Sequence, residues 1–433
     1  MVRLLRACIS LTSLSLFQVT LTRLVRESGN GIPGNLIGHM QPFESTGTAS
    51  FPGHRFYLAP PGQPSTVVCR FFVRAGTSVY FYNPFSHHDD DVGACRHGNN
   101  NNKYRSVAAL SEHDQIRYDA QVLNYEFGKA YKEFTGGSEW LSMYPRSPPL
   151  HPIWPTDYIG QQHKVYSRET QFHSNVPASS SSRRILSWSE LENHEEIAYP
   201  RQRHPGEMEI NLTVLSCEPR LLEIQHFLSD VEVDHILELA KGRNLHLSTT
   251  GKDDKDGKAD VDTRTSYNTW ISRYSSPIVD AIYRRVADVL HIDESLLRHR
   301  SQNVTDRRGA SSQPLSEDLQ LVHYEDGQQY TAHHDFSYPD RSGDGQWSPP
   351  SRSINVLMYL NEGMEGGETS FPRWRNGETT RGLNVVPQKG KAVIFYMVTP
   401  DGNLDDLTQH AALPVTQGEK WLANLWIWDP VRW

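Results

Sequence analysis

The sequence contains little cysteine and has no excess of positive charge. Its four cysteines, at positions 8, 69, 95 and 217, are too few for a disulfide framework, and they form no cluster that could bind zinc. A formal net charge of −8 gives no overall attraction to phosphate. These shortages exclude a disulfide-stabilised scaffold and a thiolate zinc centre, and we expect no nucleic-acid partner. The sequence is consistent with either a disulfide between Cys69 and Cys95 or two buried thiols.

Long apolar runs are also missing, which excludes a membrane protein with several spans. Near the start of the chain, two arginines precede a moderately apolar stretch at residues 7–22, without a clear cleavage site. We expect residues 1–26 to be a signal peptide or a single N-terminal membrane anchor; an amphipathic tail is the alternative. Glycosylation sequons at Asn211 and Asn303 agree with entry into the secretory pathway, and we predict a location in the endoplasmic reticulum.

A chain of 433 residues is longer than one ordinary domain, so we expect two folded units. Residues 46–174 are rich in aromatic residues and contain strand-like runs between polar segments, which predicts a small β-rich accessory domain of unassigned role. Residues 175–208 combine a serine run, scattered charge and several prolines, and are typical of a linker. Residues 209–433 form the second predicted domain.

This second domain begins with helical patterns and continues with strand patterns. Ser229 and Glu232 form a capping box before apolar residues at helical spacing, and Ser276 and Pro277 begin a second helix. From residue 319 onward, five apolar, β-branched or aromatic runs are separated by turns. The order predicts an α+β fold in which a double-stranded β-helix, or jelly roll, is flanked by helices. The mouth of such a barrel is a natural place for a metal or a small ligand.

The triplet His333-His334-Asp335 offers two metal ligands. Alternate residues of a strand share a face, so His333 and Asp335 are expected to point together while His334 points away. His410 is the candidate third ligand. Two imidazoles and one carboxylate leave a mononuclear iron(II) with open positions for a co-substrate and oxygen. Similar triplets that begin at positions 87, 88 and 291 lie in a polar loop or at a helix end, and we interpret them as solvated residues.

Ordered motifs surround the His333 triplet. In chain order they are YEDGQQYTAHHD at 324–335, Arg352 followed by NVLMYLN at 355–361, GGETSFP at 366–372, PQKGKAVIF at 387–395 and HAALPVTQGEKWLANLW at 410–426. This series resembles the catalytic domain of the prolyl 4-hydroxylase family, especially its collagen-type and plant or algal members. The resemblance covers residues 213–433.

The resemblance implies which residues bind the metal and the co-substrate. His333, Asp335 and His410 would bind iron(II), and Lys420 would bind the distal carboxylate of 2-oxoglutarate. A carboxylate buried in a barrel needs a cationic partner, which agrees with this role for Lys420. The alternative for Lys420 is a surface lysine at the end of a strand.

Four further residues receive roles from the resemblance. Tyr359 would donate its hydroxyl to the distal carboxylate and Tyr324 would lie near the co-substrate, although either is equally consistent with a core tyrosine. Arg352 and Trp426 match positions that face the substrate peptide in this family. Trp428 departs from the family pattern, because better-known plant-type members carry a histidine near the substrate, so the resemblance does not define substrate preference.

The implied activity is hydroxylation of peptidyl proline like that of a procollagen-proline 4-dioxygenase, coupled to oxidative decarboxylation of 2-oxoglutarate to succinate. It requires iron(II), 2-oxoglutarate, oxygen and L-ascorbate, with a proline-containing peptide or protein as the substrate. One alternative is the same site acting on lysine or another substrate; another is a catalytically silent module that binds proline-rich peptides. The complete set of His333, Asp335, His410 and Lys420 favours an enzyme. The residues before Ile210 do not resemble the additional domains of vertebrate collagen enzymes, so no partner subunit is assigned.

Overall fold

The computed structural model divides into two compact units. The N-terminal unit comprises residues 1–148, 337–349 and 401–404, and the C-terminal unit comprises residues 149–336, 350–400 and 405–433. The structure describes residues 7–13, 22–27, 33–40, 45–50, 52–59, 67, 69–74, 77, 79–82, 107–146, 148–173, 208–248, 264–299, 314–336, 352–375 and 381–429.

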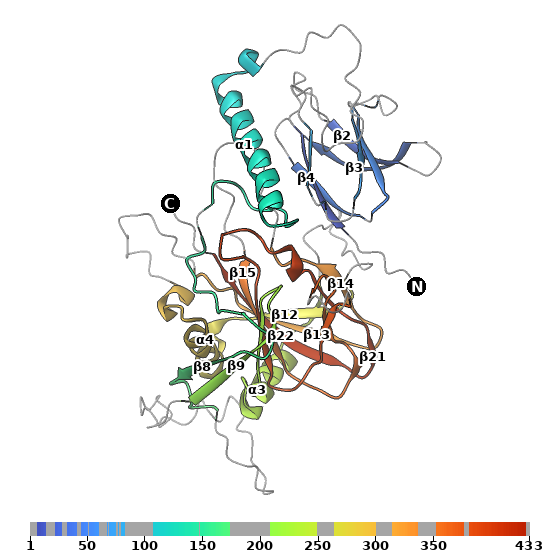
Figure 1. Ribbon diagram of the computed structural model, residues 1–433. Coiled ribbons are helices and arrows are strands. Elements are labelled where there is room, and N and C mark those ends of the chain that lie inside the picture. Colours follow the sequence, from blue (N-terminus) through green and yellow to red (C-terminus); the bar gives the residue numbers. More distant parts are fainter. Residues whose placement is uncertain are drawn as a thin grey trace, which may run out of the picture. The chain divides into compact units, whose positions relative to one another are not determined.

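The N-terminal unit contains short strands and one long helix (Figure 1). Its sheets have the strand orders β4-β1-β7 and β3-β2-β5-β6. Ser111 caps α1 by accepting a hydrogen bond from the backbone NH of Asp114. Phe81 of β7 stacks on Tyr125 of α1 with ring centroids 4.5 Å apart, so an aromatic contact joins helix and strand. The elements are β1 (Ala7–Ser13), β2 (Thr22–Glu27), β3 (Pro33–Met40), β4 (Ser45–Ser50), β5 (Arg55–Ala59), β6 (Cys69–Phe72), β7 (Val79–Tyr82), η1 (Val107–Ala109) and α1 (Glu112–Phe134).

The structure differs in places from the domain boundaries expected from the sequence. Strand β1 and most of β2 lie within residues 1–26, and both pair with later strands; cleavage or anchoring of this segment stays a prediction. No helix among the described residues is long and apolar enough to cross a membrane. Residues 149–173 belong to the C-terminal unit, because β8 pairs there with β9. The predicted linker lies outside the described residues, apart from Met208 at the start of β9.

The cysteines are in different states. Cys69 is disulfide-bonded, whereas Cys217 is a free thiol. The alternative of a buried thiol is therefore wrong for Cys69, and Cys95, its candidate partner from the sequence, lies outside the described residues.

The C-terminal unit contains two main sheets whose strands alternate along the chain. The major sheet has the order β11-β12-β13-β22-β15-β19-β10-β9-β8, the minor sheet has the order β14-β20-β17-β18, and β16 pairs with β21. This alternation is that of a jelly roll and confirms the predicted double-stranded β-helix. The elements are β8 (Gln162–Ser167), β9 (Met208–Ser216), β10 (Leu221–Ile224), α3 (Asp230–Lys241), β11 (His246–Leu247), β12 (Tyr267–Ile271), η3 (Arg273–Ser275), α4 (Pro277–Leu290), η4 (Glu294–Leu297), β13 (Leu319–Tyr324), β14 (Tyr330–His333), β15 (Arg352–Tyr359), β16 (Glu365–Gly366), β17 (Thr369–Phe371), β18 (Leu383–Val385), β19 (Ala392–Tyr396), η5 (Asp406–Thr408), β20 (His410–Ala412), β21 (Val415–Gln417) and β22 (Lys420–Trp428).

Helices α3 and α4 cover one face of the major sheet. Val233 of α3 and Val286 of α4 share a buried core with Val356 of β15 and Leu425 of β22. Helix α3 begins with the predicted capping box of Ser229 and Glu232, and α4 has Ser276 as its cap and Pro277 in its first turn, so both helix predictions are confirmed.

The pleat of the central strands separates the helix-covered core from the barrel interior. Val356 and Met358 of β15 lie in the helix-covered core, so Asn355 and Tyr359 of the same strand face the opposite way. On β22, Leu425 lies in that core while Trp426 faces away from it. In Figure 1, α4 lies to the left of these central strands and β14 to their right. The candidate site is on the side that the helices leave open.

Candidate metal centre

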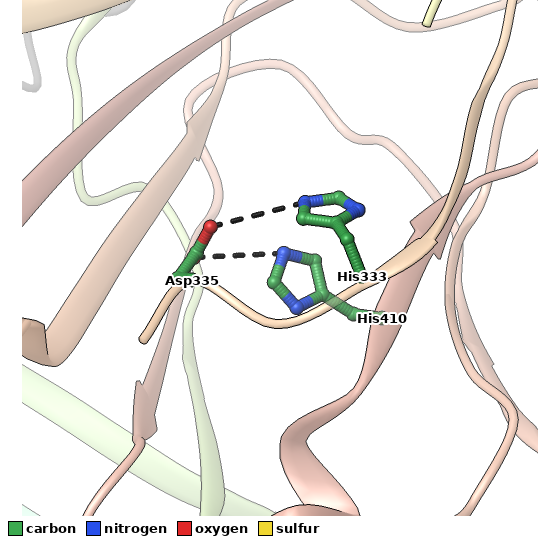
Figure 2. Close-up of side chains that lie close together, drawn as sticks. All are labelled: His333, Asp335 and His410. Carbon is green, nitrogen blue, oxygen red and sulfur yellow. Dashed lines mark ion pairs between the residues drawn. The ribbon is translucent and has the colours of Figure 1, made fainter. Parts of the chain in front are cut away.

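The three predicted ligands lie together in the C-terminal unit (Figure 2). The ligand atoms of His333, Asp335 and His410 are within 4.8 Å of one another, and no other such cluster of potential ligands occurs among the described residues. The Nε2 atom of His333 is 3.8 Å from one carboxylate oxygen of Asp335, and that of His410 is 3.6 Å from the other. His333 ends β14 and pairs in register with His410 of β20, so the minor sheet brings the two imidazoles together.

Backbone carbonyl groups orient both imidazoles. The Nδ1 atom of His333 lies 2.8 Å from the carbonyl oxygen of Thr331, and that of His410 lies 3.0 Å from the carbonyl oxygen of Thr408. A carbonyl oxygen only accepts, so Nδ1 carries a proton in each ring, and Nε2 is the nitrogen that faces Asp335. Burial and the neighbouring His410 hold the pKa of His333 well below its usual range, despite the opposing effect of Asp335. The neutral imidazole required of a metal ligand is therefore the stable form of His333.

Two donors hold the carboxylate of Asp335. Its Oδ2 atom accepts hydrogen bonds from Nδ2 of Asn355, at 2.8 Å, and from Nε1 of Trp426, at 2.9 Å. Burial raises the pKa of Asp335, but His410, His333, Arg352 and the Trp426 hydrogen bond outweigh it and lower the pKa to about 2. The carboxylate is therefore charged at neutral pH, and Oδ1 is free to face a cation.

Lys420 is the second feature of the site. Its side chain is fully buried, and its amino group finds no hydrogen-bond acceptor among the described residues. Burial lowers the pKa of Lys420 to about 7, although Glu368 raises it. The backbone makes room for the lysine stem at Gly367, which has a φ of +72° and where a Cβ atom would lie 3.4 Å from Cδ of Lys420. An unpaired buried amine at this place is suited to an anionic ligand.

The two predicted co-substrate tyrosines flank Lys420. Its Nζ atom is 5.5 Å from the ring centroid of Tyr324 and 5.7 Å from that of Tyr359. The Tyr359 hydroxyl donates to Oγ1 of Thr369 at 2.8 Å. Burial raises the pKa of Tyr324 and of Tyr359, so both hydroxyl groups stay protonated. The structure thus brings both tyrosines to Lys420, while their role in binding stays a prediction.

The predicted substrate-facing pair lies next to Asp335. The guanidinium carbon of Arg352 is 3.8 Å from the ring centroid of Trp426, and Arg352 makes a bidentate ion pair with Glu317 at 2.5 and 2.8 Å. Trp270 is 39% exposed, and its ring centroid lies 5.9 Å from that of Trp426. The indole NH of Trp426 is already donated to Asp335, so this residue is left with its ring face for other contacts.

The sequence interpretation missed the role of Asn355. This side chain is the polar member of a buried and otherwise largely apolar strand, and it anchors a predicted ligand. The sequence did contain a signal for this role: Asn355 precedes Val356 and lies on the same strand face as Tyr359, which was already a candidate site residue. Of the triplets dismissed above, those beginning at 87 and 88 lie outside the described residues, while His291 is the left-handed C-cap of α4 and Asp293 caps η4.

Comparisons with known proteins agree on one family. Residues 319–428 match the 2OG-Fe(II) oxygenase superfamily. Three prolyl 4-hydroxylases of Arabidopsis thaliana are similar to this chain. Probable prolyl 4-hydroxylase 7 is 31% identical over 227 residues, and the match covers 50% of this chain and 65% of that protein. For probable prolyl 4-hydroxylase 8 the identity is 33% over 231 residues, with 50% of this chain and 70% of the relative covered, and for prolyl 4-hydroxylase 5 it is 31% over 228 residues, with 49% and 69% covered.

A solved structure is also similar. The viral collagen prolyl hydroxylase of Paramecium Bursaria Chlorella virus-1, in complex with 2-oxoglutarate, is 26% identical to this chain. The match covers 48% of this chain and 96% of the viral protein with a TM-score of 0.35. On the sequence relatives, the chain belongs to the prolyl 4-hydroxylase family of iron(II)- and 2-oxoglutarate-dependent dioxygenases.

Proposed function

We propose that residues 209–433 hydroxylate proline in a peptide or protein at C4 and convert 2-oxoglutarate to succinate in the same reaction. The observation that carries this proposal is the placement of His333, Asp335 and His410 within 4.8 Å of one another in a barrel that also buries the unpaired amine of Lys420. An iron site of three protein ligands and a separate cation for a dicarboxylate are the two parts that the reaction requires.

The residues present fit iron(II) and 2-oxoglutarate. The donor set of two imidazoles and one carboxylate matches non-haem iron(II), and the unpaired Lys420 amine matches a carboxylate at the far end of the co-substrate. When bound, iron(II), 2-oxoglutarate and oxygen supply the oxidising power for insertion of an oxygen atom into a C–H bond.

The protein's own contribution is to bind, orient and shield. His333 and His410 present fixed Nε2 lone pairs, and the two hydrogen bonds to Asp335 leave a single carboxylate oxygen toward the metal. Lys420 would fix one end of 2-oxoglutarate so that its other end reaches the metal. The buried aromatic side chains Phe371 and Phe395, with ring centroids 5.8 and 5.0 Å from that of His410, exclude water from one side of the site.

A peptide substrate is supported by the surface beside Asp335 and by the names of the relatives. The exposed ring of Trp270 and the stacked pair of Arg352 and Trp426 offer aromatic faces and a guanidinium, which suit proline rings and backbone carbonyl groups. The similar plant proteins are named prolyl 4-hydroxylases.

The proposal includes a reductant and a compartment. L-ascorbate would restore iron that becomes oxidised in turnovers without substrate, as expected for this family. The pattern of residues 1–26 and the two sequons support passage through the endoplasmic reticulum; Asn211 is exposed on β9, and Asn303 lies outside the described residues.

The test is release of succinate by the purified full chain with iron(II), 2-oxoglutarate and ascorbate, with and without a collagen-like or polyproline peptide. We expect the peptide to stimulate succinate release and to gain the mass of one oxygen on proline. If proline peptides leave succinate release unchanged and lysine-rich peptides increase it, the protein is a dioxygenase, but its substrate is lysine and not proline. Peptide binding without succinate would leave a binding module.

The control is the His410→Ala variant. We expect no succinate from this variant, because the substitution removes a predicted metal ligand, and circular dichroism checks that the buried position in β20 tolerates alanine. An active His410→Ala protein would contradict the ligand assignment. His291→Ala, at the C-cap of α4, is the matched histidine change outside the site and should keep its activity.

A further inference from the structure

An imidazole, a carboxylate and a guanidinium next to the segments of the metal centre form a cluster, which we call the Asp406 cluster: His334, Asp406 and Arg373. The Nε2 atom of His334 lies 3.1 Å from the backbone oxygen of Asp406 and 3.4 Å from its Oδ1 atom. Arg373 makes an ion pair with the same Oδ1 atom. The side chains of His334 and Arg373 are only 3% and 10% exposed, while that of Asp406 is 32% exposed, so the contacts are partly shielded from water.

Each member of the cluster belongs to a segment that carries or touches a predicted ligand. His334 stands between His333 and Asp335, and its side chain points away from theirs into the cluster. Asp406 begins η5, the turn that leads directly to His410. Arg373 lies two residues after Phe371, whose ring packs 5.8 Å from that of His410.

The cluster therefore joins the three segments at one carboxylate. Partial burial would raise the pKa of Asp406, but the contacts with His334 and Arg373 hold it below its usual value. The charged carboxylate can thus hold both neighbours at once. The contact between His334 and Asp406 links the segment of His333 and Asp335 to the turn that precedes His410.

We propose that His334, Asp406 and Arg373 are positioning residues that set the separation of His410 from the other two ligands and so raise the affinity for the metal. This inference rests on the proposed function of the site, because it assumes that His333, Asp335 and His410 bind the ion. Residues that support metal ligands without binding the metal commonly change metal affinity by about 10-fold to 100-fold, and we expect an effect of about this size here.

The alternative is that the cluster stabilises the fold without acting on the site. The two roles differ in what a substitution changes. A positioning role predicts weaker metal binding and an altered ligand field in a protein that is still folded, whereas a purely structural role predicts a lower melting temperature with unchanged metal affinity.

The experiment measures Co(II) binding to the metal-free full chain by visible absorption, without 2-oxoglutarate or turnover. We expect Asp406→Asn to weaken Co(II) binding by about 10-fold to 100-fold and to shift the absorption bands of the bound ion. Arg373→Gln should have a smaller effect in the same direction, because it leaves the His334 contact in place. Arg284→Gln is the matched control: Arg284 also pairs with carboxylates of the C-terminal unit, Glu169 and Asp280, and should leave Co(II) binding unchanged.

A second comparison keeps the test valid if Asp406→Asn does not fold. His334→Gln and Arg373→Gln are combined in a double-mutant cycle, and a positioning role predicts that their effects on Co(II) affinity are not additive, since both act through Asp406. Unchanged affinity and spectra in all folded variants would overturn the inference while leaving the proposed function intact. Failure of the unmodified chain to bind Co(II) would overturn the proposed metal site itself.

Discussion

Two buried cations in the C-terminal unit have opposite surroundings. Arg285, on α4, is fully buried, and its guanidinium contacts both carboxylate oxygens of Glu232 on α3 at 2.5 and 2.9 Å and the backbone oxygen of Phe227 at 2.8 Å. Lys420, inside the barrel, is equally buried but has no acceptor among the described residues. Arg285 thus has a buried counter-ion within the protein, whereas Lys420 has none among the described residues.

The difference follows from what an unpaired buried charge costs. Removal of an ammonium ion from water is compensated only by a nearby anion or by loss of its proton. Burial lowers the pKa of Lys420 to about 7, so loss of the proton is the route open to the ligand-free protein near neutral pH. We therefore expect the ligand-free barrel to be less stable than it would be with an apolar side chain at this position, and we expect binding of an anion to recover that free energy.

The largest effect should come from breaking the paired cation. We expect Glu232→Gln to lower the free energy of unfolding by about 3–5 kcal/mol, because it leaves the guanidinium of Arg285 buried without a counter-ion. Guanidinium-induced unfolding followed by circular dichroism measures this change. Glu238→Gln on the same helix is the control: its partner, Lys241, is 76% exposed, and the change should be small. Equal losses in the two variants would contradict the assigned role of Glu232.

Removal of the unpaired cation, Lys420, should not lower stability, in contrast to the loss expected for Glu232→Gln. We expect Lys420→Met to weaken 2-oxoglutarate binding by about 2–5 kcal/mol, while the free energy of unfolding of the ligand-free protein stays equal or rises. Calorimetric titration with Mn(II) in place of iron measures binding. Lys389→Met, which removes a lysine paired with Asp230 and Asp234 at the surface, is the control and should bind normally. Normal binding by Lys420→Met would rule out this lysine as the carboxylate partner.

The next largest effect should be the pH dependence that Lys420 gives to 2-oxoglutarate binding and to stability. The bound carboxylate favours the ammonium form of Lys420, so binding takes up a proton once the pH exceeds about 7. We expect 2-oxoglutarate affinity to be level below that pH and to fall above it by up to about tenfold per pH unit. Without ligand, stability should rise with pH between about 7 and 10.5, because the unfolded chain binds this proton more tightly. A pH-independent affinity would contradict both statements.

The smallest effect concerns the neutral groups around Lys420. The Tyr359 hydroxyl donates to Thr369, so Tyr359→Phe and Thr369→Val should each lower the free energy of unfolding by about 1 kcal/mol. If the hydroxyl turns to the co-substrate on binding, Tyr359→Phe alone should also weaken 2-oxoglutarate binding, by a similar amount. Parallel unfolding and binding titrations of both variants measure these changes; equal binding by both would leave Tyr359 as a core residue.

The sequence singled out the candidate ligands and Lys420 because these residues lie in short motifs. His333 and Asp335 are two residues apart, and the resemblance of the surrounding motifs to the prolyl 4-hydroxylase family assigned the roles of His410 and Lys420. The two capping signals likewise predicted α3 and α4, since a helix start depends on neighbouring residues.

Long-range pairing could not be predicted in the same way. The edge strand β8 joins the major sheet by pairing with β9, although residues 168–207 separate the two strands in the chain, and no local signal marks that pairing. The hydrogen bond from Trp426 to Asp335 and the ion pair of Arg352 with Glu317 also depend on strand pairing. Family resemblance assigned Arg352 and Trp426 to the substrate but gave no information on these contacts.

The two donors that hold Asp335 have a common origin in the sheet. Asn355 of β15 and Trp426 of β22 are directly opposite each other in the pairing of these strands. A shift of that pairing by one residue would turn one strand's polar side chain toward the helices and remove its donor from Asp335. If Asp335 binds the metal as proposed, metal loading would report correct assembly. A population in which β15 and β22 are mispaired would contain the same residues and much of the same secondary structure, but we expect it to bind the ion weakly or not at all. Titration with a metal would count the correctly assembled molecules in any preparation of this protein.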